Sequence, residues 1–177
     1  ATSTLEAGLD VKSMSETSTK VFILEVMGRH AGWIAAASAL AARNETDPPH
    51  IILMPEVPFA KKKFIDKVKQ TVADEGFCVV VASEGTRYKN GMFLADSGLT
   101  DAFGHKQLGG VAPVLAQMIS STGLKNHWAV SDYLQRSARH ISSKTDLDQA
   151  YAVGKKAVEF ALAGKNAVMP IIKRLSN

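Results

Sequence analysis

The sequence contains a single cysteine and no long apolar run, and each shortage excludes a class of protein. One cysteine in 177 residues leaves no disulfide framework and no cysteine-based metal site, which favours a reducing compartment. Cys78 stands inside the apolar run 77–81, where we expect a small buried hydrophobe. No stretch of 18 apolar residues occurs, and the first residues lack the pattern of a signal peptide. We therefore expect no membrane association and a cytoplasmic location.

The sequence also lacks a strong excess of either positive or negative charge. The net charge of +4 comes from basic residues spread along the chain, and the tightest cluster is the lysine run 61–63. That run has no aromatic residues interleaved with it and opens a helical pattern, so it is expected to be a solvated helix face. We therefore predict no nucleic-acid partner. A modest positive balance suits an anionic small molecule, and a hydrophobic share of 46% suffices for a buried core.

Short apolar runs alternate with longer amphipathic segments along the chain. Strands are predicted at residues 21–26, 51–54, 77–82, 127–130 and 167–172. Helices are predicted at about residues 31–42, 62–74, 111–121 and 147–163. This alternation predicts an α/β fold with three layers, a mainly parallel sheet with helices on both faces.

Three parts of the chain have less regular patterns. Residues 1–19 are polar, and we assign them to a partial N-terminal segment, helix or loop, that precedes one α/β domain at residues 20–177. Residues 85–110 contain repeated glycines, which indicates a functional loop. The last predicted helix has an apolar stripe of Leu147, Tyr151, Val158 and Leu162.

Ligands of open α/β sheets bind beyond the carboxyl ends of the strands. The residues that follow three predicted strands there are Met27, Gly28 and Arg29, then Glu84, then Tyr133 and Arg136. Each group alone has an ordinary structural alternative as a turn, a helix cap or a surface contact. Two arginines and a carboxylate at one sheet edge together predict a ligand with hydroxyl and phosphate groups.

The stretch 25–33, which reads Glu-Val-Met-Gly-Arg-His-Ala-Gly-Trp, resembles the phosphofructokinase segment that contacts fructose 6-phosphate. Similar stretches follow in family order at residues 54–56, 83–85 and 133–136, and the resemblance covers about residues 17–173. It implies a phosphofructokinase-like fold in which Met27, Gly28 and Arg29 hold the sugar. It also implies that Glu84 binds a sugar hydroxyl, and that Tyr133 and Arg136 bind the 6-phosphate.

Two departures from the family pattern refine these expectations. Lys20 stands where many members carry an arginine that reaches the substrate phosphate of a neighbouring subunit, so the resemblance implies a homo-oligomer. Tyr133 replaces the histidine of ATP-dependent bacterial members, which makes the chain more like the pyrophosphate-dependent branch. His105 lies in the glycine-containing loop, and we interpret it as an ordinary loop histidine outside the site.

The resemblance implies an enzyme of glycolysis that transfers a phosphoryl group from pyrophosphate, or from ATP, to the 1-hydroxyl of fructose 6-phosphate, giving fructose 1,6-bisphosphate. The glycine-rich donor loop and the Thr-Ile-Asp-Asn-Asp segment of the family have no match in these residues. No catalytic base is therefore assigned, and Arg29 is a candidate for stabilising transition-state charge. Mg²⁺ is expected as a cofactor held mainly by other residues, with no metal site here. This piece alone is expected to be inactive.

Two other functions remain open from the sequence. The chain could be a regulatory lobe that senses a sugar phosphate without catalysing a reaction. It could also be a sugar-binding module of the periplasmic type, although the absence of a signal peptide and the order of the motifs argue against that alternative.

Overall fold

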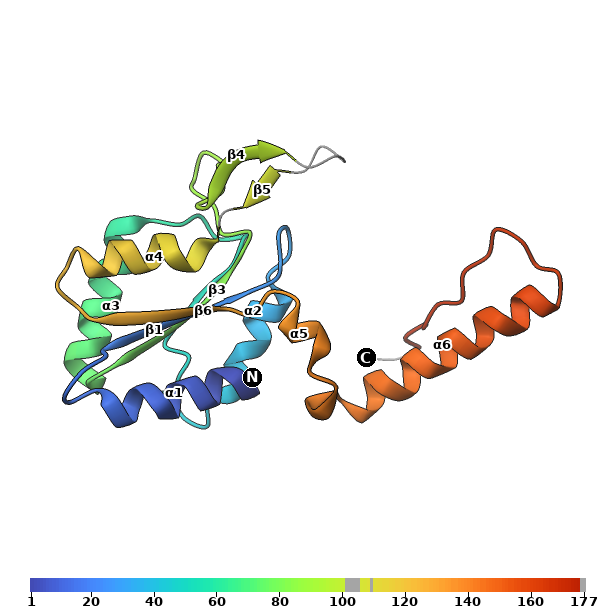
Figure 1. Ribbon diagram of the computed structural model, residues 1–177, viewed down its shortest axis with the longest axis horizontal. Helices are drawn as coiled ribbons and strands as arrows, with labels where there is room; N and C mark the ends of the chain where they lie inside the picture. Colours follow the sequence, from blue (N-terminus) through green and yellow to red (C-terminus); the bar gives the residue numbers. More distant parts are fainter. Residues whose placement is uncertain (101–105, 109, 176–177) are drawn as a thin grey trace. The chain divides into compact units, whose positions relative to one another are not determined.

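The computed structural model describes residues 1–100, 106–108 and 110–175, and its contacts divide the chain into two units, Ala1–Gln135 and Arg136–Asn177. The first unit is built around a four-stranded sheet in which every neighbouring pair is parallel (Figure 1). Its strands, in spatial order, are β2 (Ile51–Leu53), β3 (Cys78–Ser83), β1 (Val21–Val26) and β6 (Asn126–Val130).

Helices cover both faces of this sheet because successive side chains of a strand point to opposite sides. On one face, Ile23 and Val80 are buried against α3 and α4; on the other, Leu24 and Val81 pack with Ala35 of α2. Figure 1 shows the same division into layers. The helices of this unit are α1 (Thr2–Met14), α2 (Trp33–Ala37), the 3₁₀ helix η1 (Ser38–Ala41), α3 (Lys61–Glu75) and α4 (Val111–Ser120). The predicted three-layer α/β fold is confirmed.

The register of the sheet brings the carboxyl ends of three strands together. Val26, at the end of β1, lies opposite Ser83 at the end of β3, and Glu25 lies opposite Val130 at the end of β6. The segments that follow these three strands therefore start at the same edge, as the sequence predicted.

The core also explains the state of the single cysteine. Cys78 is fully buried among apolar side chains of the sheet and of α3 and α4. Burial raises the pKa of its thiol to about 12, so the thiol stays protonated and unreactive at neutral pH. The expected role as a small buried hydrophobe is confirmed.

The helix predicted at residues 31–42 is shorter and changes type. It begins as α2 at Trp33, and the amide of the preceding Gly32 donates to Oε1 of Glu56. The hydroxyl of Ser38 donates to the carbonyl oxygen of Ala35 at 2.5 Å, and the chain continues from there as η1. A serine that bonds back to the preceding turn tends to distort an α-helix, which accounts for the difference.

Residues 85–110, predicted as a loop, contain a short antiparallel pair. Strand β4 (Asp96–Thr100) pairs with β5 (Lys106–Leu108). His105 lies outside the described residues. The N-terminal segment, for which helix and loop were both open, forms α1, and the domain boundary after residue 19 stays a prediction.

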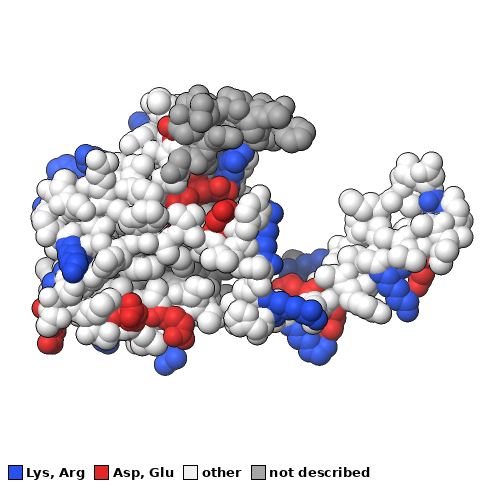
Figure 2. Space-filling model, in the orientation of Figure 1, with Lys and Arg blue, Asp and Glu red and all other residues white. Residues whose placement is uncertain are grey.

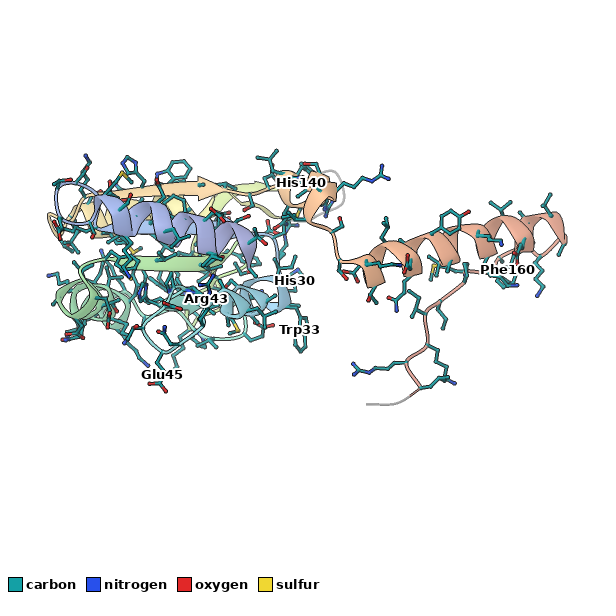
Figure 3. The ribbon with its side chains drawn as sticks, turned by 90° about the horizontal axis from the view of Figure 1, so that it is seen from below. His30, Trp33, Arg43, Glu45, His140 and Phe160 are labelled. Atoms are coloured by element: carbon teal, nitrogen blue, oxygen red, sulfur yellow. The ribbon has the colours of Figure 1, made fainter. Side chains whose placement is uncertain are left out.

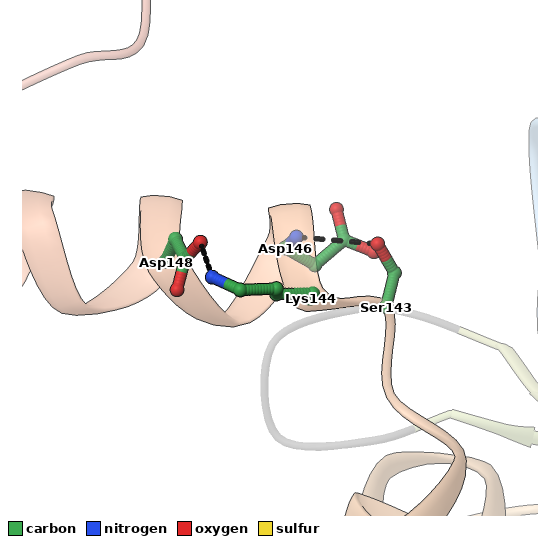
Figure 4. Close-up of polar contacts among 4 residues, drawn as sticks. All are labelled: Ser143, Lys144, Asp146 and Asp148. Atoms are coloured by element: carbon green, nitrogen blue, oxygen red, sulfur yellow. Dashed lines mark hydrogen bonds and ion pairs between the residues drawn. The ribbon is translucent and has the colours of Figure 1, made fainter.

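The second unit consists mainly of the 19-residue helix α6 (Lys144–Leu162). Ser143 caps its start by accepting a hydrogen bond from the amide of Asp146 at 3.4 Å, and Lys144 forms an ion pair with Asp148 at 2.5 Å (Figure 4). The remaining short elements are α5 (Leu134–Ser137), which crosses the boundary between the units, and the 3₁₀ helix η2 (Arg139–Ile141).

The strand predicted at residues 167–172 does not form. This segment is described, and it pairs with no other strand among the described residues; Ile171 is 72% exposed. The apolar stripe predicted on the last helix is likewise exposed along its length, as Tyr151 and Leu162 show. Both patterns identify surfaces suited to burial, but a strand forms only where a neighbour supplies hydrogen bonds. In the part of the chain that the structure describes, no helix has the length and apolarity to cross a lipid bilayer.

Candidate functional site

The turn that follows β1, residues 27–32, is folded tightly around Gly28. Gly28 has φ of +140°, a conformation that side-chain-bearing residues rarely adopt. A Cβ atom added there would lie 2.7 Å from the carbonyl oxygen of Ala31 and 2.8 Å from the hydroxyl oxygen of Ser83. The glycine is therefore required both by the backbone and by the neighbouring strand end.

Side chains from other elements bind the backbone of this turn. The amide of Gly28 donates to Oε1 of Glu84 at 3.1 Å, and the hydroxyl of Ser83 donates to the carbonyl oxygen of Gly28. The amide of Gly32 donates to Oε1 of Glu56 at 2.8 Å. The turn is thus held by residues at the end of β3, the neighbour of β1 in the sheet, and by Glu56, which follows β2 on the far side of β3.

The segment after β6 is tied to the same turn. The amide of Met27 lies 3.4 Å from Oε1 of Gln135, close enough for a weak hydrogen bond. Residues from three neighbouring strand ends therefore meet at the turn. Three of the predicted site residues, Met27, Gly28 and Glu84, are in direct contact or adjacent in the chain.

Arg29 is the cationic residue of this turn. It is half-buried, and its Nε atom is enclosed by protein without a hydrogen-bond partner among the described residues. A guanidinium has further donor nitrogens that match phosphate oxygens, so Arg29 is a candidate to bind an anionic ligand through its terminal nitrogens.

A cavity of about 320 Å³ opens beside the turn. Three carboxylates line it, those of Glu25, Glu84 and Asp132, and Trp128 adds an aromatic wall. Figure 2 shows a group of acidic atoms in a hollow of the molecular surface. Carboxylates accept hydrogen bonds from hydroxyl groups, and an apolar ring packs on the carbon face of a sugar. The cavity therefore fits a small polyhydroxylated ligand.

Glu25 is the most buried of these carboxylates, with 5% of its surface exposed. One of its oxygens accepts a hydrogen bond from the amide of Ala112, at the start of α4, at 2.7 Å. Burial raises the pKa of Glu25 above its ordinary value, and the nearby Glu84 and Asp132 add to the rise, while the hydrogen bonds from Val111 and Ala112 oppose it. Glu25 thus links the cavity to the N-terminus of α4.

The remaining predicted site residues are Tyr133, Arg136 and Lys20. Tyr133 belongs to the first unit and is 65% exposed, whereas Arg136 begins the second unit, which is described separately. Lys20 precedes β1, and its ammonium contacts the carbonyl oxygen of Ser15. Since β1 separates Lys20 from Met27 by roughly 20 Å, Lys20 does not belong to the cavity of its own chain.

The sequence did not identify every residue that shapes this site. It omitted Glu25, Glu56, Trp128 and Asp132, although Glu25 and Glu56 belong to the stretches that resemble the family. It also omitted Arg87, whose guanidinium donates to the carbonyl oxygen of Arg29. The role of Glu56 could not be recognised from the sequence, because its side chain binds the backbone amide of Gly32 in another segment. The spacing of residues along the chain does not indicate such a contact. Asp132 could have been found, since it immediately precedes Tyr133 at the same edge.

Comparison with known proteins identifies the same family that the sequence motifs resemble. The chain matches the family model described as phosphofructokinase over residues 2–161. A relative from Halomonas elongata named pyrophosphate--fructose 6-phosphate 1-phosphotransferase is 66% identical over 178 residues, which cover 100% of this chain and 42% of the relative. A relative of the same name from Xanthomonas campestris is 58% identical over 179 residues, covering 100% of this chain and 43% of that relative. The chain thus spans less than half the length of these curated relatives.

Solved structures show the same likeness. The crystal structure of a pyrophosphate-dependent phosphofructokinase from Marinobacter aquaeolei has a TM-score of 0.80 and 60% identity, covering 99% of this chain and 40% of that one. A phosphofructokinase from Saccharomyces cerevisiae has a TM-score of 0.53 and 19% identity over 74% of this chain and 15% of that one, which is a likeness of fold alone.

Proposed function

Because this chain belongs to the phosphofructokinase family, we propose that it binds fructose 6-phosphate as the phosphoryl acceptor of a pyrophosphate-dependent phosphofructokinase. The observation that carries the proposal is the position of Arg29. Arg29 belongs to a turn that is fixed from several sides, and Met27 of the same turn lines the cavity together with the carboxylates. A cation beside hydroxyl-accepting groups matches a ligand that carries both phosphate and hydroxyls.

Glu84 has two tasks in this proposal. One of its oxygens accepts the amide of Gly28, and a carboxylate has further acceptor sites that a sugar hydroxyl can use. Because the same group lines the cavity and fixes the turn, sugar binding and the position of Arg29 are coupled through one side chain.

The proposed roles of Tyr133 and Arg136 follow from the family resemblance. A phenol and a guanidinium are both suited to a 6-phosphate, and arginine binds phosphate oxygens in pairs. Lys20 lies too far from its own cavity, so we propose that it serves the site of a second copy in a homo-oligomer. Tyr133 and Arg136 both have interactions within the chain, which ligand binding would have to accommodate.

In the proposed reaction, the 1-hydroxyl oxygen of the sugar forms a bond to a phosphorus of pyrophosphate, and orthophosphate leaves. The hydroxyl proton passes to a base outside this chain, since no residue here is assigned that role. Arg29 would stabilise the negative charge on the transferring group.

Mg²⁺ also remains a proposal. Within the described residues, no group of three or more His, Cys, Asp or Glu side chains is arranged to hold a metal ion. These residues do not fit a magnesium site by themselves, so no step is assigned to the ion here. We propose glycolysis as the pathway, because fructose 1,6-bisphosphate would be the product, and the cytoplasm as the location, which agrees with a single buried thiol.

Calorimetric titration of the 177-residue chain with fructose 6-phosphate tests this function. We expect binding that weakens at least about tenfold in Arg29→Ala, since a hydrogen bond to a charged group is lost. Arg43→Ala is the matched control, because Arg43, which Figure 3 labels, is exposed and lines a different cavity together with Phe77. Equal affinity for fructose without the phosphate, or no effect of Arg29→Ala, would contradict the proposal.

A second measurement tests which phosphoryl donor the enzyme uses. The enzyme completed to the length of its relatives should form fructose 1,6-bisphosphate with pyrophosphate and much less with ATP. Binding of fructose 6-phosphate by an enzyme that forms no product with either donor would favour the alternative of a regulatory lobe.

A further inference from the structure

The segment after β3 forms a small hairpin that places Arg87 opposite Phe93. The two residues form an antiparallel bridge, and the turn between them is closed by a hydrogen bond from the amide of Tyr88 to the carbonyl oxygen of Met92 at 2.8 Å. Gly91 has φ of +83°, as an Asn-Gly turn requires. The hairpin thus holds the side chains of Arg87 and Phe93 next to each other.

The hairpin is itself attached to the core. The amide of Leu94 donates to the carbonyl oxygen of Thr86, and the amide of Phe59 donates to that of Arg87, both at 2.8 Å. Leu94 and Phe59 are both buried in the main apolar cluster. The backbone of Arg87 therefore has a fixed position relative to the sheet.

The guanidinium of Arg87 reaches from this hairpin to the turn after β1. Its Nη2 donates to the carbonyl oxygen of Arg29 at 3.0 Å and lies 3.3 Å from Nδ1 of His30. Because a guanidinium can only donate, Nδ1 of His30 must be the acceptor in this contact. The ring of Phe93 lies under the guanidinium, 4.6 Å from its central carbon, and the imidazole of His30 is 6.2 Å from the same ring.

Gly85 permits this approach. A Cβ atom at Gly85 would collide with the carbonyl oxygen of Arg29 and lie 2.6 Å from that of Gly28. The turn after β1 and the segment after β3 are therefore in backbone contact. A side chain that reaches from one to the other, as Arg87 does, sets how Arg29 is presented.

We propose that Arg87 is a positioning residue that fixes Arg29 through its carbonyl oxygen, with Phe93 holding the guanidinium in place. The proposal rests on the proposed function of Arg29 as an anion-binding group. Arg87 acts through the backbone of Arg29 and has no assigned contact with substrate. A lysine cannot replace it, because an ammonium lacks the planar fork that donates to Arg29 and stacks on Phe93 at once.

The ligand-independent test is hydrogen exchange at the amides of Gly28 and Gly32 in the 177-residue chain. Arg87→Ala should raise both exchange rates at least about tenfold, since the turn loses the contact that restrains Arg29. Lys89→Ala, at the exposed tip of the same hairpin, is the control and should leave them unchanged. Unchanged rates in Arg87→Ala would overturn the proposal, whether or not the chain binds a sugar phosphate.

The ligand-dependent test is a double-mutant cycle with fructose 6-phosphate. Arg87→Ala should weaken binding about tenfold in the wild-type background and have almost no effect in the Arg29→Ala background, because it acts through Arg29. Arg87→Lys should resemble Arg87→Ala, and Phe93→Leu should have a smaller effect in the same direction. Equal losses in both backgrounds would overturn the positioning role.

The hydrogen-exchange test and the binding test distinguish the positioning role of Arg87 from the proposed binding of fructose 6-phosphate. A wild-type chain that binds no fructose 6-phosphate contradicts the proposed function, and the exchange rates then decide alone whether Arg87 restrains the turn. Binding that depends on Arg29 but not on Arg87 overturns only the positioning role.

Discussion

The amide of Gly28 donates a hydrogen bond to Oε1 of Glu84 at 3.1 Å, which joins the turn after β1 to the end of β3. Because the two strands are neighbours in register, this contact spans residues far apart in the chain but adjacent in the sheet. The carboxylate also lines the cavity, so one side chain shapes the turn and the ligand surface together.

Replacing Glu84 should separate these two tasks. Glu84→Gln keeps an oxygen that can accept the amide of Gly28 but loses the negative charge, so the fold should persist. We expect affinity for fructose 6-phosphate to fall about tenfold, as loss of a charge-assisted hydrogen bond implies. Calorimetry measures the affinity and circular dichroism the fold, with Glu6→Gln on the exposed surface of α1 as control. Unfolding of the Glu84→Gln chain would show a structural role instead.

Gly28 should tolerate no side chain. Gly28→Ala places a Cβ within 2.8 Å of two oxygen atoms in a conformation that alanine rarely adopts. We expect a loss of about 2 to 4 kcal/mol in the free energy of unfolding, measured with urea. Gly91→Ala is the matched control, since Gly91 also has positive φ but open space around it, and it should lose less. Similar losses for the two variants would mean that the contacts of Gly28 contribute nothing.

The sequence predicted the sheet and its edge because buried parallel strands are continuous apolar runs bounded by turn residues such as Gly28 and Pro55. Strand β1 was predicted with the bounds that the structure has, Val21–Val26. The start of α6 was missed by three residues, although Ser143 followed by Asp146 is the pattern of a capped helix. The predicted strand at 167–172 failed because strand formation depends on a partner outside the segment.

The site could be predicted only in part, for a related reason. Arg29 and Glu84 could be proposed from the sequence because Arg29 lies three residues after β1 and Glu84 directly follows β3, and their roles stay predictions. The role of Arg87 depends on a hairpin that turns its side chain back toward Arg29, and that contact joins positions 58 residues apart. The composition of the chain and the spacing of its residues cannot reveal such a contact. It becomes apparent only when the order of the strands is known, because β1 and β3 are neighbours in the sheet.

Glu25 should make stability depend on pH in the acidic range. Its pKa in the folded chain is above the ordinary value of 4.5, mainly because of burial, so the folded state binds more protons than the unfolded state just above pH 4.5. Stability from this group should therefore fall as pH rises from about 4.5 to the raised pKa and then level off. Glu25→Gln, which can still accept the amide of Ala112, should remove this component. Urea unfolding of both chains across this range measures it, and parallel curves would contradict the assignment.

His50 should have the opposite effect on stability, in a pH window that ends at its ordinary pKa of 6.5. Its Nδ1 accepts the amide of Val79 at 2.9 Å, and burial lowers the pKa of His50 below its ordinary value of 6.5. Between the lowered pKa and 6.5 the unfolded state binds more protons than the folded state. Stability should therefore rise with pH through this window and level off above about 6.5. His50→Asn keeps an acceptor for the amide and should flatten the rise, which urea unfolding at several pH values would show. A rise that persists in His50→Asn would assign the dependence to another group.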